Sequence, residues 1–395
     1  MTQSVWRLTL ILGALTAFTP LAVDMYLPGL PTLERALATD AGRVQMTLSL
    51  FFVGLALGQF VLGPVSDRYG RRIPLLAGNL LFIAASVGCA LAREIDSLIL
   101  WRFVQAVGSC AGLVIGRAMV RDLFEPRETA RIFSLLMLVM GVAPILAPLL
   151  GGYLLVWFDW HAIFWVLAAF GTVVMLAALL WLPETHSREK AQPLNLGHVL
   201  RGYGSLLADR RYMGYTLASS LLMGGMFAYI AGSPFVFIDL FAVPADAYGW
   251  IFGINAVGII GMAQVNRLLL RRFTLDEVLL GGIAMATLAG FVLLVAAAFG
   301  VGGTGLGGIL ALWLPLFFYI ASLGVVLPNA GASAMAGEAA RAGMAAALMG
   351  MLQFATGAAT SAILSQIHDG TALPMAAIVA LCGFGGAAAR WILVR

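Results

Sequence analysis

The feature that most constrains the fold of this chain is a succession of apolar runs, each about as long as a membrane is thick. A transmembrane helix needs about 20 mostly apolar residues. The 395 residues are 61% hydrophobic and only 11% charged, whereas soluble domains are about 25% charged. The sequence therefore predicts an all-α membrane protein with twelve transmembrane helices. We place them at residues 5–27, 44–64, 73–92, 98–120, 132–156, 161–182, 212–236, 247–269, 277–299, 308–328, 343–366 and 372–393.

The positive charges between the runs indicate the orientation of the chain. With the N-terminus on the inside, nearly every cation outside the runs falls on one side of the membrane. The opposite side receives only Arg35, Arg43 and Arg93. Arginine and lysine accumulate in cytoplasmic loops. We therefore expect both termini to be cytoplasmic, which also requires an even number of spans.

The longest polar connection divides the spans into two groups of six. We expect domains at residues 1–183 and 212–395, joined by a cytoplasmic linker at 184–211. Within the linker, apolar and basic residues are mixed in a way that is compatible with a short amphipathic helix at the membrane interface. A disordered linker is the alternative.

The connection between the second and third runs is rich in arginine and glycine. It reads Gly63-Pro64-Val65-Ser66-Asp67-Arg68-Tyr69-Gly70-Arg71-Arg72. Its charges cannot face lipid, because burying each in hydrocarbon would cost several kcal/mol. Gly63 and Gly70 would allow the close approach and positive φ of a tight turn. Asp67 is available as a partner for Arg68, Arg71 and Arg72. A basic turn that only fixes topology is the alternative.

This connection resembles the loop between helices 2 and 3 of Major Facilitator Superfamily transporters, G-x-L-x-D-R-x-G-R-R, and differs only at Val65. The resemblance implies two parallel six-helix repeats with a central binding site. It also implies that the connection acts as a conformational gate. Asp67 would then meet the positive N-terminal end of a helix from the second half, and the candidate helix begins near Gly343.

Asp24 is the one acid that these boundaries place in the interior of a span, near the outer third of the first one. An ionisable group in the membrane is expensive unless it faces a partner or a water-filled cavity. Because a low-dielectric environment favours the neutral carboxyl, such a group can exchange protons near neutral pH. We therefore predict that Asp24 couples transport to protons. The alternative is that it lies at the interface and caps a helix end broken by Pro28 and Pro31.

Arg102 is an intramembrane cation in the fourth span, in the pattern Arg102-x-x-Gln105-x-x-Gly108. The pattern resembles the helix-4 motif of the superfamily, whose arginine is implicated in proton coupling, and only this resemblance implies that role. An arginine that extends to the outer interface is the alternative.

The fifth span contains Pro144, Pro148, Gly151 and Gly152. Prolines bend a helix and glycines permit close helix contacts. The segment resembles the helix-5 motif of drug/proton antiporters, G-x-x-x-G-P-x-x-G-G. It departs from that motif in having alanine at residues 143 and 147 and an extra proline. The alternative is that the prolines kink this helix only for packing and have no role in antiport.

Together these segments resemble the Bcr/CflA drug-resistance family, which includes bicyclomycin, chloramphenicol and florfenicol exporters. The resemblance implies a monomeric antiporter in the bacterial inner membrane, which exports small, largely apolar drugs by alternating access. The proton gradient would drive it without any cofactor. Thr16 stands where some relatives carry a second acid, which favours neutral or zwitterionic substrates. A metabolite exporter or proton symporter on the same fold is the alternative, and a membrane-embedded enzyme or sensor is a remote one.

Several other polar or aromatic residues in or beside the spans are candidates for lining a drug-binding cavity. They are Tyr26, Tyr229, Asn255, Phe317, Tyr319, Gln353 and Phe354. Ordinary helix packing is the alternative for each. The histidines are scattered and predict no metal site, and no nucleophile–base pair predicts an enzyme. The sparse charges predict no nucleic-acid partner. Small molecules, protons and the lipid bilayer are the expected partners.

Overall fold

A computed structural model describes residues 3–185, 196–303, 305–338 and 341–394. The secondary structure of these residues is entirely helical. Its elements are α1 (Gln3–Asp24), η1 (Leu27–Gly29), α2 (Leu30–Ala36), α3 (Ala41–Tyr69), α4 (Arg72–Ala90), α5 (Ile95–Leu123), α6 (Pro126–Trp157), α7 (His161–Trp181), α8 (Leu196–Ala208), α9 (Arg210–Pro234), η3 (Phe235–Leu240), α10 (Ala245–Leu269), α11 (Leu275–Ala298), α12 (Leu306–Met335), α13 (Ala342–Ile367) and α14 (Leu373–Leu393).

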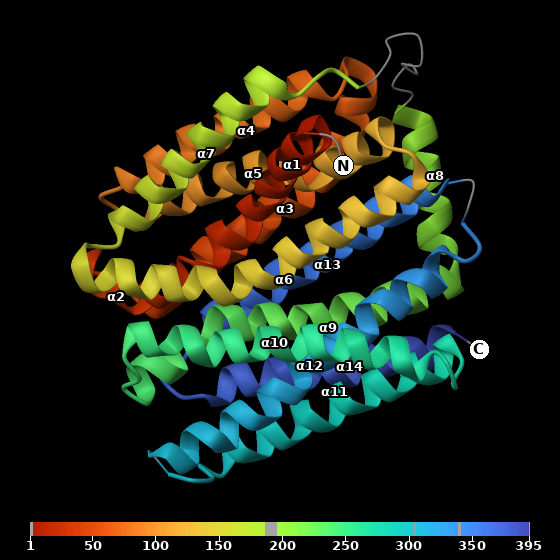
Figure 1. The fold of residues 1–395 in the computed structure, drawn as a ribbon. Coiled ribbons are helices and arrows are strands. Elements are labelled where there is room, and N and C mark those ends of the chain that lie inside the picture. The colour runs from red at the N-terminus through yellow and green to blue at the C-terminus, as the bar shows by residue number, and fades with distance from the viewer. Residues whose placement is uncertain (1–2, 186–195, 304, 339–340, 395) are drawn as a thin grey trace.

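The described residues form 12 helical segments that are long and apolar enough to cross a membrane, which confirms the predicted fold class. Helices α1 and α3–α7 pack mainly against one another, as do α9–α14. We call these the first and second groups. They meet along α3 and α13 and along α6 and α10. Both termini lie toward the end of the bundle that carries α8 (Figure 1). We call this the α8 end.

The first span extends beyond its predicted end at residue 27. Helix α1 stops at Asp24, and the chain continues through the short turn η1 into α2, so the apolar segment ends only at Ala36. Pro28 and Pro31 each lie at the start of a new helical element. Proline is tolerated there because the first backbone N–H groups of a helix have no partner within it. The prolines therefore break the helix without ending the span.

The arginine-rich connection is shorter than predicted. Helix α3 continues through Pro64 to Tyr69, so Gly63 is a helical residue, and no atom lies within 4 Å of the place where its Cβ would be. The expectation that Gly63 forms part of a tight turn is therefore wrong. Gly70 has φ +89°, a backbone conformation that favours glycine, and it makes the turn into α4.

The contacts between the two groups are tight at the end opposite α8. Gly42 lies against the backbone carbonyl of Ser365, with no room for a Cβ. Arg35 of α2 and Asp239 of η3 form an ion pair at 3.5 Å. At the α8 end, Gly261 and Gly343 face open space. The structure is therefore shut at the end opposite α8.

Helix α8 bridges the two groups at its own end of the bundle. The ring of Tyr203 lies 5.3 Å from that of Phe60 in α3, measured between centroids. Gly202 packs against the side chain of Met344 in α13. The connection between α7 and α9 thus contains a helix that contacts both groups.

Candidate functional site

Asp24 lies at the point where α1 breaks, and only 5% of its surface is exposed. Within the described part of the chain, no hydrogen bond or ion pair reaches its carboxyl group. The hydroxyl groups of Tyr229 and Tyr248 lie within electrostatic range of that carboxyl. Since both tyrosines belong to the second group, Asp24 faces the seam between the groups. Asp24 is the last residue of α1, and the candidate span continues beyond it to Ala36.

The residues facing Asp24 form a hydrogen-bonded cluster. The side-chain amide of Asn255 donates to the Tyr229 hydroxyl at 2.9 Å, and the hydroxyls of Ser233 and Tyr248 lie 2.7 Å apart. The other amide atom of Asn255, Oδ1, is buried and has no partner among the described residues. We call these four residues the hydroxyl cluster. It offers both donors and an acceptor to any molecule that reaches Asp24.

Ser233 and Tyr248 were missed by the sequence analysis. Ser233 lies one helical turn after Tyr229 on α9, and Tyr248 lies two turns before Asn255 on α10. These spacings place each pair on one helix face. The sequence therefore held a signal for both residues.

Arg102 is fully buried in the first group. Its Nη1 donates to the carbonyl oxygen of Ala22 at 2.9 Å and to Gln105 Oε1 at 2.6 Å. Gln105 in turn donates to the hydroxyl of Ser86 at 2.8 Å. The side chain therefore does not extend to the membrane interface.

The guanidinium of Arg102 is also surrounded by aromatic rings. Its Cζ lies 4.5 Å from the ring centre of Tyr26, 4.3 Å from that of Phe51 and 5.8 Å from that of Phe164. Cation–π contacts of this kind stabilise a desolvated cation. Nε and Nη2 have no hydrogen-bond partner among the described residues, and no carboxylate there pairs with Arg102. Arg102 and Asp24 thus remain unpaired with each other.

Within the arginine-rich connection, Arg71 holds the polar contacts together. It is largely buried, and its guanidinium contacts Ser66, Asp67 and Asp122, with an Nε–Oδ2 distance of 3.1 Å to Asp122. The Asp67 side chain is 62% exposed and pairs with Arg71 of its own group. The predicted contact between Asp67 and α13 belongs to a state in which the α8 end is shut, and it stays a prediction.

Glu184 is a third residue that the sequence analysis missed. Its two carboxylate oxygens accept hydrogen bonds from the backbone N–H groups of Arg71 at 2.8 Å and Arg72 at 3.1 Å. These N–H groups open α4, where a carboxylate satisfies unpaired donors and the positive end of the helix dipole. A Cβ on Gly70 would lie 2.6 Å from a Glu184 oxygen. The start of α4 is thus tied to the segment that follows α7.

Two other arginines complete the connection. Arg72 Nη2 donates to the carbonyl of Leu179 in α7 at 2.7 Å. The Arg68 guanidinium lies over the ring of Tyr69, 5.3 Å from its centre. Both contacts stay within the first group.

The glycines of α6 position the broken segment after Asp24. Pro144 and Pro148 lie inside α6, which continues past them. Gly151 lies against the carbonyl of Met25, and Gly152 lies against the backbone of Ala245 in the second group. A side chain at residue 151 would push into the turn that follows Asp24. These two glycines therefore let α6 contact both the turn beside Asp24 and the second group.

The remaining candidate cavity residues lie in different surroundings. The Tyr26 hydroxyl lies 3.0 Å from that of Thr47, and the Tyr319 hydroxyl donates to the Leu222 carbonyl at 3.1 Å; both side chains are fully buried. These contacts are those of helix packing. Phe317 packs against Trp313, 5.9 Å away, and against Gly258 of α10.

An aromatic contact crosses the seam between the groups. The ring of Phe52 in α3 lies 4.2 Å from that of Phe227 in α9, which lies 5.8 Å from that of Phe354 in α13. Gln353, the residue before Phe354, is half-buried. Of the candidates, Tyr229 lies within electrostatic range of Asp24 across the seam, Asn255 bonds to Tyr229, and Phe354 packs on Phe227.

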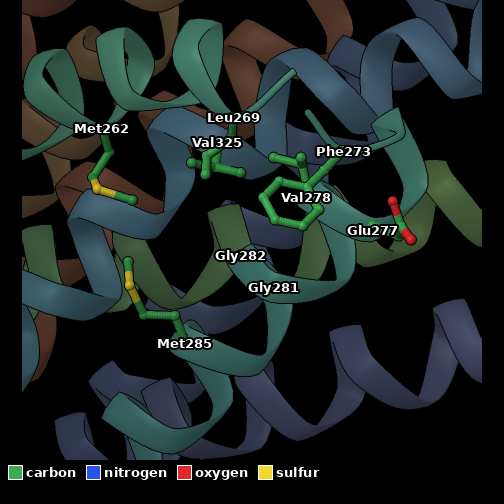
Figure 2. A pocket seen from close by; sticks show the side chains of 9 residues that line it. All are labelled: Met262, Leu269, Phe273, Glu277, Val278, Gly281, Gly282, Met285 and Val325. Carbon is green, nitrogen blue, oxygen red and sulfur yellow. The ribbon is translucent and has the colours of Figure 1, made fainter. Parts of the chain in front are cut away.

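A separate apolar cavity of about 440 Å³ lies within the second group, between α10, α11 and α12 (Figure 2). Figure 2 shows Met262 and Met285 on one side of it and Glu277 at the other. It is lined by Met262, Leu269, Phe273, Glu277, Val278, Gly281, Gly282, Met285 and Val325. None of these is a predicted site residue, so this cavity is distinct from the site around Asp24.

Comparison with known proteins identifies the family. Residues 12–365 match the model of the Major Facilitator Superfamily. The chain belongs to the Major Facilitator Superfamily. This major facilitator is 39% identical to an uncharacterized MFS-type transporter of Bacillus subtilis, YdgK, over 98% of this chain and 95% of the relative. It is a multi-pass membrane protein from a family of transporters.

Two further relatives of this major facilitator are named for drug resistance. A bicyclomycin resistance protein homolog of Haemophilus influenzae is 30% identical over 96% of this chain and 94% of its own. A chloramphenicol resistance protein of Pseudomonas aeruginosa is 31% identical over 78% of this chain and 74% of its own. They confirm the resemblance to the Bcr/CflA branch.

The solved structures confirm the fold. A D-xylose-proton symporter matches with a TM-score of 0.77 and 15% identity, covering 100% of this major facilitator and 98% of its own chain. The nucleoside transporter NupG matches with a TM-score of 0.71 and 13% identity, covering 99% of this major facilitator and 98% of its own chain.

Proposed function

We propose that this chain is a proton-coupled antiporter that exports small, largely apolar drugs by alternating access. The proposed substrates are phenicol- or bicyclomycin-like, because relatives over most of the chain carry the names of bicyclomycin and chloramphenicol resistance. The proton gradient would supply the energy, with no cofactor.

The observation that carries this proposal is the carboxyl group of Asp24. It is buried at the seam, and among the described residues it has neither a hydrogen bond nor an ion pair. A buried carboxylate without a partner is stabilised when it takes up a proton or when a ligand donates a hydrogen bond to it. The two events exclude each other at one group, which gives exchange of proton for drug without a second gate.

The hydroxyl cluster supplies the second side of the proposed site. A neutral drug with hydroxyl or amide groups would donate to Asp24 or Asn255 Oδ1 and accept from the tyrosine hydroxyls. Buried polar groups reject molecules that leave them unpaired, because each unpaired group costs about 1–3 kcal/mol. Phe52 and Phe227 would contact the apolar part of the drug.

Arg102 would hold the broken end of α1 in place. Its hydrogen bond to Ala22 reaches the last turn of the helix that carries Asp24. In the proposed cycle, Asp24 takes up a proton and releases drug when the site faces outward. It releases the proton and accepts drug when the site faces inward.

We further propose a bacterial inner-membrane location with both termini, and hence the α8 end, in the cytoplasm. The proposed domains are residues 1–183 and 212–395, joined by a linker at 184–211, and the proposed active form is the monomer. The distribution of arginine supports this orientation. The close contacts at the opposite end of the bundle, Gly42 against Ser365 and Arg35 with Asp239, support a closed outer face in this orientation.

A susceptibility panel tests the proposed substrates. The chain is expressed in a pump-deficient bacterial host and challenged with chloramphenicol, florfenicol, bicyclomycin and a dicationic dye. We expect higher tolerance of at least one of the three neutral antibiotics and no protection against the dication. Protection against the dication alone would contradict the proposed substrate class, and unchanged tolerance of every compound would contradict drug export.

A further inference from the structure

The apolar cavity in Figure 2 is a groove on the outside of the bundle. Helix α11 lies at the edge of the bundle and packs mainly on α12 and α14 (Figure 1). Helices α10 and α11 both pack on α12 but hardly on each other, which leaves the groove between them. Val325 of α12 is buried at its floor, whereas Phe273 and Gly281 on its walls are exposed. We call it the α10–α11 groove, and it opens toward the lipid bilayer.

The depth and the lining of the α10–α11 groove suit a lipid acyl chain. Its wall on α11 runs from Glu277 to Met285, about eight residues, which corresponds to about 12 Å along the helix axis. One leaflet of the hydrocarbon core is about 15 Å thick, half of the bilayer's total of about 30 Å. Among the described residues that line the groove, Glu277 at the α8 end is the one that carries charge. The side chains of Met262 and Met285 are flexible enough to adapt to a chain.

The turn at the α8 end of this groove is basic. Arg271 and Arg272 lie between α10 and α11, directly before Phe273, which lines the groove. Arg267 lies about one helical turn earlier, in the last turn of α10. All three arginines are exposed, and among the described residues none of them has an ion pair or a side-chain hydrogen bond. We call these three arginines the basic turn.

The acids beside the basic turn do not neutralise it. Oε2 of Glu277 accepts hydrogen bonds from the backbone N–H of Thr274 at 2.8 Å and from its hydroxyl at 2.9 Å, which holds this carboxylate at the start of α11. Asp276 pairs with Arg390 of α14. Three arginines therefore outnumber the one carboxylate in this region that has no cation partner. The excess positive charge lies where the spans end, at the depth of the lipid headgroups.

We propose that the α10–α11 groove binds an anionic phospholipid, with one acyl chain between α10 and α11 and the phosphate at the basic turn. Guanidinium groups suit phosphate because they donate two parallel hydrogen bonds. Basic pockets between transmembrane helices on the cytoplasmic side bind anionic headgroups. In the proposed orientation the lipid comes from the cytoplasmic leaflet. This inference goes beyond drug export, since it concerns a ligand on the lipid-facing side of the second group.

A second groove provides an internal comparison. A cavity of about 590 Å³ lies between α11 and α14, with Phe291 and Phe384 toward one end and Arg390 at the other. Its lining is also mainly apolar, but Arg390 pairs with Asp276 and donates from Nη1 to the carbonyl of Val394 at 2.8 Å. An acyl chain fits here too, but among the lining residues no unpaired cation selects the headgroup. We call this the α11–α14 groove.

Photocrosslinking tests the proposal. The full chain is purified in detergent and mixed with phosphatidylglycerol that carries a photoreactive diazirine in the middle of one acyl chain. After irradiation and digestion, mass spectrometry locates the labelled residues. Unlabelled phosphatidylglycerol and phosphatidylcholine with the same acyl chains compete in parallel.

We expect label on the α10–α11 groove, at residues such as Met262 and Met285. Unlabelled phosphatidylglycerol should displace it at a concentration about tenfold or more below that of phosphatidylcholine, because each arginine near an anionic lipid contributes about fivefold in affinity. In the α11–α14 groove the two lipids should compete equally.

The Arg271→Gln/Arg272→Gln protein should lose the preference for phosphatidylglycerol in the α10–α11 groove, and its labelling of the α11–α14 groove should not change. Arg121→Gln is the matched control, since Arg121 is also exposed at the α8 end but belongs to α5 of the first group. It should keep the preference.

A second pair of variants fills the groove. Gly281 lines it, and no atom lies within 4 Å of the place where its Cβ would be, so Gly281→Leu should exclude the acyl chain and remove the label. Gly261→Leu is the control, because Gly261 of α10 has equally open surroundings but does not line the groove. It should keep the label.

Four results would overturn the proposal. They are the absence of label from the α10–α11 groove, equal competition by the two lipids there, the same preference in the α11–α14 groove, and an unchanged preference in the double arginine variant. Label that chloramphenicol displaces but phosphatidylglycerol does not would mean that the drug occupies the groove, and would also overturn it. Because the readout is lipid binding and not transport, failure of the drug-export proposal would leave this result interpretable.

Discussion

The guanidinium of Arg102 donates a hydrogen bond to the backbone carbonyl of Ala22, at 2.9 Å. Ala22 lies in the last turn of α1, two residues before Asp24. The two ionisable residues of the candidate site are therefore linked through the backbone and not through an ion pair. This arrangement positions Asp24 and leaves its carboxyl free to bind a proton or a ligand.

The first prediction concerns Arg102. Arg102→Ala should strongly impair transport, because the last turn of α1 loses its anchor and Gln105 loses its partner. Arg102→Lys should restore transport poorly, since an ammonium lacks the planar fork that spans two acceptors and stacks on rings. Drug efflux from loaded cells measures both variants, with membrane content checked by immunoblot.

Arg93→Ala is the control, since Arg93 is exposed and outside the candidate spans. It should retain the activity of the parent. Full activity of Arg102→Ala would mean that this arginine serves only packing or insertion.

A second prediction concerns the turn between α3 and α4. Gly70→Ala should lower the thermal stability of the purified protein, because a non-glycine residue at φ +89°, ψ 168° is strained by about 1–3 kcal/mol. Its Cβ would also crowd Glu184. The loss should appear as a lower unfolding temperature in detergent.

Gly63→Ala is the matched control in the same motif. Gly63 is helical and faces open space, so alanine should leave stability unchanged or raise it by about 0.5–1 kcal/mol. Equal loss in both variants would mean that Gly70 is not needed for its backbone conformation.

The third prediction concerns Asp67. If Asp67 meets the N-terminal end of α13 when the α8 end shuts, Asp67→Asn should shift the population inward-facing and slow turnover. A change of about 1.4 kcal/mol corresponds to a tenfold change in population, so part of such a contact is measurable. Spin labels on the α8 ends of α3 and α13 report the distance.

Asp122→Asn is the comparison, because Asp122 also pairs with Arg71 but belongs to α5. It should weaken the Arg71 contacts without the same shift in population. Lost transport with an unchanged distance distribution in Asp67→Asn would mean that this residue serves folding or insertion.

The spans and the buried acid could be predicted because membranes impose strong local rules. A sufficiently long run of apolar residues has few alternatives to a spanning helix. An acid inside such a run, such as Asp24, is therefore easy to recognise in the sequence. The arginine-rich connection at residues 63–72 and the patterns around Arg102 and Pro148 could also be recognised, because each is a short stretch of sequence. The order of the helices followed from these features.

The misses arose where distant residues meet or where helices tolerate proline. Pro64 does not end α3, and Pro28 and Pro31 break the first helix without ending its span. Glu184 reaches the start of α4 from the far end of α7, a contact that no local pattern encodes. Ser233 and Tyr248 share helix faces with Tyr229 and Asn255, which the sequence could have shown, but that these faces lie opposite Asp24 follows only from the packing of α9 and α10.

The measurement that tests the central claim most directly compares two modes of transport in the Asp24→Asn protein. Asparagine keeps the size and polarity of the side chain but cannot titrate. The purified variant is placed in proteoliposomes with labelled chloramphenicol, or whichever antibiotic the susceptibility panel identifies. Uptake driven by an imposed pH gradient and drug–drug exchange without a gradient are then measured side by side.

We expect the Asp24→Asn protein to lose gradient-driven uptake and to retain exchange, because exchange requires alternating access but no net proton movement. Asp159→Asn, which changes an acid in a connection outside the candidate spans, should retain both activities. Gradient-driven uptake at the wild-type rate in the Asp24→Asn protein would contradict the assignment of Asp24 as the coupling group.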